Sequence, residues 1–164
     1  MRGNVETRLR KADEGQYDAL VMAAAGLIRL GLSHRITSYF EPPDWLSAPG
    51  QGAVAVESRA DDSATDELLR SIDDRVARAE TDAERTLLHT LQGGCQVPVG
   101  ARAEVHGQDV VLHALVARPD GTEVVRSEGR GPADQAIQLG LTVAEDLLAR
   151  GGEAIVATFR ETES

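Results

Sequence analysis

A single cysteine, Cys95, has the most distinctive chemistry in this chain. It follows two glycines in the stretch Gly93-Gly94-Cys95-Gln96-Val97-Pro98, between a helix-forming and a strand-forming segment. Because glycines leave room for a large group near the sulfur, Cys95 is a candidate nucleophile or covalent attachment point on a loop. A lone cysteine is more often an inert apolar residue, and spacing alone favours that interpretation.

Three arginines and one glutamine are candidates for binding an anion. Arg2 precedes a predicted helix N-terminus, Arg8 lies one to two turns into that helix, and Arg29 is the third arginine of this set. Helix N-termini favour anions, and guanidinium groups bind carboxylates with two donors. Gln51 lies between two glycines, where a ligand can approach the backbone closely. Spacing alone favours solvated charges for the arginines and a plain turn around Gln51.

Other catalytic patterns are weak. The four histidines show no metal-ligand spacing, so no zinc site is predicted, and no serine lies in a nucleophile-elbow motif. A cysteine-dependent hydrolase that uses Cys95 and His89 is an alternative. It would need a contact between helix and loop that their separation of six residues does not ensure.

Composition limits the class of protein. The chain has 164 residues, of which 41% are hydrophobic and 3% aromatic, so the core must be aliphatic. Residues 1–52 carry balanced charge, and the net charge of −10 therefore falls on residues 53–164, which argues against nucleic acid as a partner. Because the sequence has no long apolar run and no apolar signal segment, we expect a soluble, cytoplasmic protein without membrane contact.

Residues 1–72 read as alternating helix and strand. The pattern predicts helices over 4–14 and 27–32 around a buried strand over 18–25, an order typical of a parallel-sheet fragment. A loop rich in proline and glycine over 41–52, a strand over 53–58 and a helix over 63–72 follow. Ser63 and Asp66 resemble a capping box at the start of that helix.

The remaining residues read as one α+β unit. A helix is predicted over 75–91, strands over 101–106, 109–117 and 122–127, and a helix over 132–150 that has Pro132 in its first turn. Residues 154–159 are expected to form a last short strand or the end of the packing layer. The apolar positions at helical spacing predict two inner faces: Val76, Ala79, Ala83, Leu87 and Leu91; and Ile137, Leu141, Ala144 and Leu148.

Separate segments together resemble the porphobilinogen deaminase (hydroxymethylbilane synthase) family, and the resemblance covers essentially the whole chain. The matching stretches are Arg2-Gly3-Asn4-Val5-Glu6-Thr7-Arg8-Leu9; Tyr17-Asp18-Ala19; Ala25-Gly26-Leu27-Ile28-Arg29-Leu30-Gly31; Gly50-Gln51-Gly52-Ala53-Val54; Glu57-Ser58-Arg59; Ala83-Glu84-Arg85; and Gly93-Gly94-Cys95-Gln96-Val97-Pro98-Val99-Gly100.

The resemblance implies a transferase of tetrapyrrole and haem biosynthesis. Cys95 matches the cysteine that holds a dipyrromethane cofactor through a thioether. The enzyme extends this primer by four porphobilinogen units with loss of ammonia. Arg2, Arg8 and Arg29 match arginines that pair with carboxylates of cofactor or substrate, and Gln51 matches a cleft residue. The implied partners are porphobilinogen and oligopyrrole intermediates.

The resemblance also implies a division into domains. Residues 1–46 would be the remnant of an α/β domain similar to periplasmic binding proteins. Residues 47–74 would be a linker and a segment returning to a first domain, and residues 75–164 a C-terminal α+β domain. The family's N-terminal half, with its catalytic aspartate, has no match here, so we expect a C-terminal part that is inactive alone. Its residues 1–72 would be disordered, rearranged or buried in a homo-oligomer. The alternative is a non-catalytic folding or interaction module.

Overall fold

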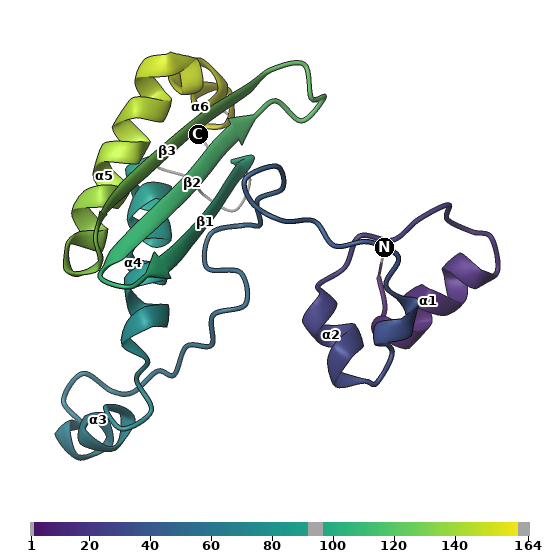
Figure 1. Cartoon of the computed structure of the whole chain (residues 1–164), viewed down its shortest axis with the longest axis horizontal. Helices are drawn as coiled ribbons and strands as arrows, with labels where there is room; N and C mark the ends of the chain where they lie inside the picture. Colours follow the sequence, from purple (N-terminus) through teal and green to yellow (C-terminus); the bar gives the residue numbers. More distant parts are fainter. Residues whose placement is uncertain (1, 92–96, 161–164) are drawn as a thin grey trace. The chain divides into compact units, whose positions relative to one another are not determined.

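The computed structural model describes residues 2–91 and 97–160 of the chain. It contains two compact units, residues 1–41 and residues 42–164, and each is described by itself. The α-helices and strands of both units are labelled in Figure 1.

The first unit is built from two helices and one short 3-10 turn. Helix α1 (Val5–Asp13) begins at Asn4, whose side chain accepts a hydrogen bond from the Thr7 N–H at 2.9 Å. Helix α2 (Ala24–Arg29) and the 3-10 turn η1 (Ser33–Arg35) follow. The helix predicted over 4–14 is confirmed.

The strand predicted over residues 18–25 is wrong. Within residues 2–41 no strand forms, and the run of alanines at 23–25 instead begins α2, which also starts earlier than the helix predicted over 27–32. Alanine has the highest helix propensity, and a lone apolar segment has no second strand here to satisfy its backbone groups. The expected order of helix, strand and helix is therefore absent from the described residues of this unit.

The second unit opens with an irregular segment. The loop over residues 41–52 is confirmed, but residues 53–58 form no strand, and the side chains of Val54 and Val56 are 92% and 59% exposed. A strand needs a hydrogen-bonding neighbour, and none lies beside this segment in the described residues. Helix α3 (Ser63–Leu69) follows, and its N-cap is Asp62, which accepts from the Thr65 N–H at 3.0 Å, not the predicted Ser63.

Three antiparallel strands form the sheet, in the order β1-β2-β3. They are β1 (Val99–His106), β2 (Asp109–Ala117) and β3 (Val124–Pro132), so the predicted meander is confirmed. The third strand lies further along than the predicted 122–127, because residues 118–123 form a longer turn. Pro132 ends β3 opposite Asp109 and does not lie in the first turn of a helix.

Three helices of the second unit cover one face of this sheet (Figure 1). They are α4 (Arg75–Thr90), which Asp74 caps, α5 (Ala136–Leu147) and α6 (Glu153–Arg160). A 3-10 turn (Ala133–Gln135) precedes α5, and a turn over Leu148–Gly152 separates α5 from α6.

Of the two alternatives predicted for residues 154–159, the strand is wrong, because these residues form helix α6, which is the last element packed on the core. The single helix predicted over 132–150 is shorter. Gly151 has a φ of +110°, which breaks α5 from α6. Ile155 and Val156 are fully buried and Phe159 packs on the core, which is the spacing of a helical face.

The core lies between the sheet and these helices. The predicted positions Ala83, Leu87, Leu91 and Ala144 are buried there, but Val76 and Ile137 are 49% and 58% exposed. The buried face of helix α5 shares Ala144 with the predicted face but is otherwise displaced by about one residue toward the N-terminus. It consists of Ala136, Leu139, Gly140, Val143, Ala144 and Leu147. Gly140 sets this register, because a Cβ there would lie 2.5 Å from the Ala83 carbonyl oxygen of α4.

Candidate functional site

The free edge of β1 carries three backbone N–H groups that need acceptors. Ala101 donates to the Ser47 carbonyl oxygen at 2.9 Å, Ala103 to Glu84 Oε1 at 2.8 Å, and Val105 to Glu80 Oε1 at 3.0 Å. Two carboxylates of α4 and one carbonyl of the preceding loop therefore close this edge.

Glu84 has a second acceptor role at this edge. Its side chain is only 4% exposed, and its Oε2 accepts the Gly50 N–H at 2.6 Å. Burial raises the pKa of Glu84, and the hydrogen bonds from Ala103 and Gly50, with the charge of Arg102, only partly offset this effect. One buried carboxylate thus joins helix α4, strand β1 and the loop before them.

The triplet at residues 50–52 is a tight turn that presents Gln51. Gly50 and Gly52 have φ angles of +74° and +88°, a region that side chains other than glycine seldom adopt. The Gln51 N–H donates to the Ala48 carbonyl at 3.0 Å, and the Ala53 N–H donates to the Gly50 carbonyl at 3.1 Å. The side chain of Gln51 is exposed, so it is free to meet a ligand.

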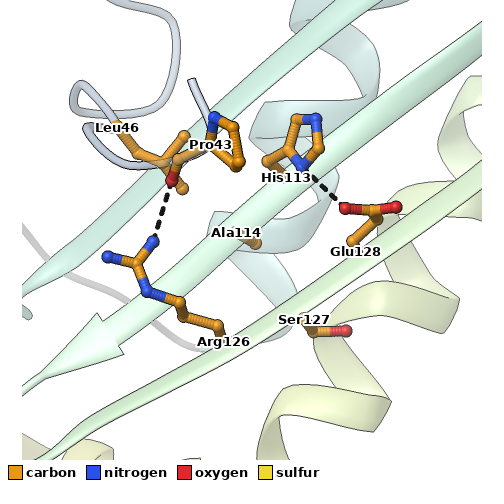
Figure 2. A pocket seen from close by; sticks show the side chains of 7 residues that line it. All are labelled: Pro43, Leu46, His113, Ala114, Arg126, Ser127 and Glu128. Atoms are coloured by element: carbon orange, nitrogen blue, oxygen red, sulfur yellow. Dashed lines mark hydrogen bonds and ion pairs between the residues drawn. The ribbon is translucent and has the colours of Figure 1, made fainter. Parts of the chain in front are cut away.

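The start of this loop lies on the uncovered face of the sheet (Figure 2). The Arg126 guanidinium donates to the carbonyl oxygens of Pro43 at 2.9 Å and Asp44 at 3.3 Å. Leu46 packs so closely on β1 that a Cβ at Gly100 would stand 3.0 Å from its Cβ. We call residues 43–50 the edge segment. Arg126 binds the start of this segment and Glu84 binds its end, so both ends are held against the rest of the second unit.

A shallow hollow of about 170 Å³ lies beside the edge segment. His113 lines it and pairs through Nδ1 with Glu128 Oε2 at 3.1 Å (Figure 2). Neither residue belongs to the set predicted from the sequence.

The three candidate arginines all lie in the first unit. Gly3 has a φ of +124°, and a Cβ there would stand 2.9 Å from Thr7 Cγ2, so only glycine fits before the Asn4 cap. Its carbonyl oxygen accepts a hydrogen bond from Arg8 Nε at 2.8 Å. Arg2 and Arg29 are exposed, and their guanidinium groups form no ion pair or hydrogen bond with the residues that the structure describes.

Cys95 lies outside the described residues, but the elements on both sides of it are defined. Helix α4 leads to Leu91, which is fully buried and donates its N–H to the Leu87 carbonyl at 3.0 Å. After the cysteine, Val97 packs against the core and β1 begins at Val99. A contact between Cys95 and His89 therefore stays untested.

The structure brings together only part of the predicted site. Gln51 and the elements that flank Cys95 belong to the second unit, and the arginines belong to the first. The sequence reasoning gave no role to Glu84. The sequence feature that could have indicated a role for Glu84 is its position in α4, where an acidic residue lies beside the buried Ala83 and Leu87. A buried carboxylate in such a face needs hydrogen-bond donors.

Residues 2–91 and 97–160 contain neither a metal-ligand cluster nor a membrane-spanning helix. No group of three or more histidine, cysteine, aspartate or glutamate side chains there could hold a metal ion. No helix in this part of the chain is long and apolar enough to cross a bilayer.

Comparison with known proteins gives matches to two family models and to curated relatives. The family model for "porphobilinogen deaminase, dipyromethane cofactor binding domain" matches residues 1–67, and that for "porphobilinogen deaminase, C-terminal domain" matches residues 79–149. A curated porphobilinogen deaminase from Desulforudis audaxviator is 52% identical over 160 residues, which is 98% of this chain and 52% of the relative. The chain thus spans about half the length of that relative.

Proposed function

Because this chain belongs to the porphobilinogen deaminase family, we propose that it carries the cofactor-holding part of a hydroxymethylbilane synthase. The reaction joins four porphobilinogen units and releases one ammonia for each unit added. The substrate carries two carboxylates on each pyrrole, so the enzyme needs several fixed cations. A cytoplasmic location belongs to the same proposal.

The role proposed for Cys95 is covalent attachment. Its sulfur would hold dipyrromethane through a thioether bond, which stays intact through every turnover. When bound, this group supplies the pyrrole carbon to which substrate units are added. The buried Leu91 before the cysteine and the core residue Val97 after it support a tether with fixed ends.

The residues of the first unit fit an anionic cofactor, and the glycine-locked start of α1 is the observation that carries the proposal. The Gly3 carbonyl takes the Nε–H of Arg8, which fixes the guanidinium and leaves its terminal N–H groups for a carboxylate. Arg2 and Arg29 add two exposed guanidinium groups that the described residues leave without a partner. We assign carboxylate binding to these three arginines.

For Gln51 we propose ligand binding through its neutral amide. Its turn leaves the side chain exposed, and an amide both donates and accepts hydrogen bonds, as pyrrole N–H groups and carboxylates require. Two further predictions follow from the family resemblance. One is the division into domains at 1–46, 47–74 and 75–164, and the other is a homo-oligomer formed through residues 1–72.

The test is reconstitution. The chain would be produced together with the part of the Desulforudis audaxviator enzyme that it does not cover, and porphobilinogen consumption and ammonia release would be measured. We expect turnover by the pair and none by the chain alone, because the resemblance assigns the catalytic aspartate to the other part.

Matched variants sharpen this test. Arg2→Gln and Arg29→Gln should lower kcat/KM strongly, whereas Arg10→Gln should not. Arg10 lies on the same helix as Arg8 but pairs with Glu14 at 3.5 Å. A stable complex without turnover would favour the alternative, a non-catalytic folding or interaction module. Turnover that is equally insensitive to all three substitutions would refute the assignment of the arginines.

A further inference from the structure

The turn that carries Gln51 has one hydrogen bond to another element. Within residues 2–91 and 97–160, the turn's other hydrogen bonds are internal, from Gln51 to Ala48 and from Ala53 to Gly50. A Cβ at Gly50 or Gly52 would meet nothing within 4 Å, so no neighbour packs against the turn on the side where these side chains would stand. The remaining link is the hydrogen bond of 2.6 Å from the Gly50 N–H to Glu84 Oε2.

Glu84 is itself held firmly. Its neighbour Ala83 is fully buried, and the Ala83 backbone lies against Gly140 of α5 so closely that no Cβ fits between them. The other carboxylate oxygen, Oε1, is held by the Ala103 N–H of β1 at 2.8 Å. The carboxylate therefore has a fixed place relative to α4, α5 and the sheet.

Two of these elements, α4 and β1, flank the Cys95 connection in sequence. Helix α4, which carries Glu84, is the element before that connection, and β1, which contains Ala103, is the element after it. We propose that Glu84 is a positioning residue, which fixes the Gln51 turn relative to the two elements that lead into and out of the Cys95 connection. The proposal rests on the proposed function only for the role of Gln51, because the positioning itself stands on the contacts.

The chemistry explains why a carboxylate is needed. Gly50 and Ala103 each donate an N–H, and they reach different oxygens of one side chain. A carboxylate accepts at both oxygens, whereas glutamine has one oxygen and one NH₂ group that only donates. Glu84→Gln therefore keeps the shape of the side chain but must lose one of the two hydrogen bonds.

The chain offers a matched control one turn earlier on α4. Glu80 accepts the Val105 N–H of the same β1 edge at 3.0 Å, but it makes no hydrogen bond to the turn. Glu80→Gln removes the same charge from the same helix face. A difference between the two variants therefore reports on the turn and not on helix charge.

Amide hydrogen exchange of the purified chain, followed residue by residue by NMR, tests the proposal. In Glu84→Gln we expect the Gly50 or the Ala103 amide to exchange at least about tenfold faster, which corresponds to about 1.4 kcal/mol. The Gln51 and Ala53 amides, whose bonds are internal to the turn, should change much less. In Glu80→Gln the Gly50 and Ala103 amides should exchange as in the wild type. Unchanged exchange of both amides in Glu84→Gln, or equal acceleration in both variants, would overturn the proposal.

A titration of the unaltered chain keeps the test valid if Glu84→Gln does not fold. The amide resonances of Gly50 and Ala103 should shift together with the ionisation of one carboxyl group, that of Glu84. The charged groups that act on Glu84 are Arg102 on β1 and Glu80 on α4. Residues 47–52 carry no charge, and α5 contacts α4 beside Glu84 through the uncharged Gly140. A Gly50 amide that ignores this ionisation would contradict the proposal. Neither readout needs porphobilinogen turnover, so the failure of this proposal is distinct from a failure of the proposed function.

Discussion

Gly140→Ala tests the close contact between helices α4 and α5 of the second unit. The added Cβ would lie 2.5 Å from the Ala83 carbonyl oxygen and 2.8 Å from Thr86 Cβ. Because the nearer obstacle is backbone, no side-chain rotation can relieve it. Helices α4 and α5 must therefore move apart, and the movement would displace Glu84 as well.

The expected loss follows from two opposing effects. Replacing glycine by alanine inside a helix favours folding by about 1 kcal/mol. Inserting a methyl group into a closely packed interface costs about 1–3 kcal/mol, and a backbone obstacle places this case at the upper end of that range. We therefore expect a net destabilisation of about 1–2 kcal/mol, or a fall in Tm of roughly 5 °C.

Thermal unfolding followed by circular dichroism is the assay. Gly131→Ala is the control, because a Cβ on Gly131 of β3 would meet nothing within 4 Å and its φ is not positive. That variant should unfold within about 0.5 kcal/mol of the wild type, as expected for a substitution away from packed features. A Gly140→Ala chain that is as stable as the wild type, or more stable, would refute the account of this helix contact.

Two further predictions follow from burial and charge. Leu87→Ala should lower the free energy of unfolding in urea by about 2–5 kcal/mol, because Leu87 is fully buried. Ile137→Ala should change it by less than about 0.5 kcal/mol, because Ile137 is 58% exposed. Equal losses would contradict the observed register of α5. Asp146 has a pKa held below its ordinary value of 3.8, mainly by the hydrogen bond from Ser127, so its contribution to stability is present above that value and is lost as pH falls through the lowered pKa. Asp146→Asn should therefore destabilise the chain at neutral pH and have little effect in strong acid, and a stability difference that is independent of pH would contradict this assignment.

The sequence predicted the second unit better than the first because its elements are supported by local patterns. The strands at 109–117 and 101–106 show period-two alternation and glycine turns, and the structure confirms them. The strand expected at 18–25 rested on apolar content alone, which does not separate a strand from a helix. The register of α5 depends on the approach of Gly140 to Ala83, a tertiary contact that helical spacing does not contain.

The candidate site divides in the same way. Arginine, glutamine and cysteine positions could be proposed from residue type and from the motifs in which they lie. Glu84 could not be assigned a role, because its role depends on the Gly50 and Ala103 N–H groups, which are 34 and 19 residues away in the sequence. Only the folded chain shows that one carboxylate serves both donors.

The attachment of dipyrromethane to Cys95 is the central claim, and intact mass spectrometry tests it most directly. The chain would be produced together with the part of the Desulforudis audaxviator enzyme that it does not cover, and then separated and weighed. The account predicts an added mass equal to one dipyrromethane group, localised to Cys95 by peptide mapping and lost in Cys95→Ser. A pair that consumes porphobilinogen while Cys95 carries no added mass would contradict it.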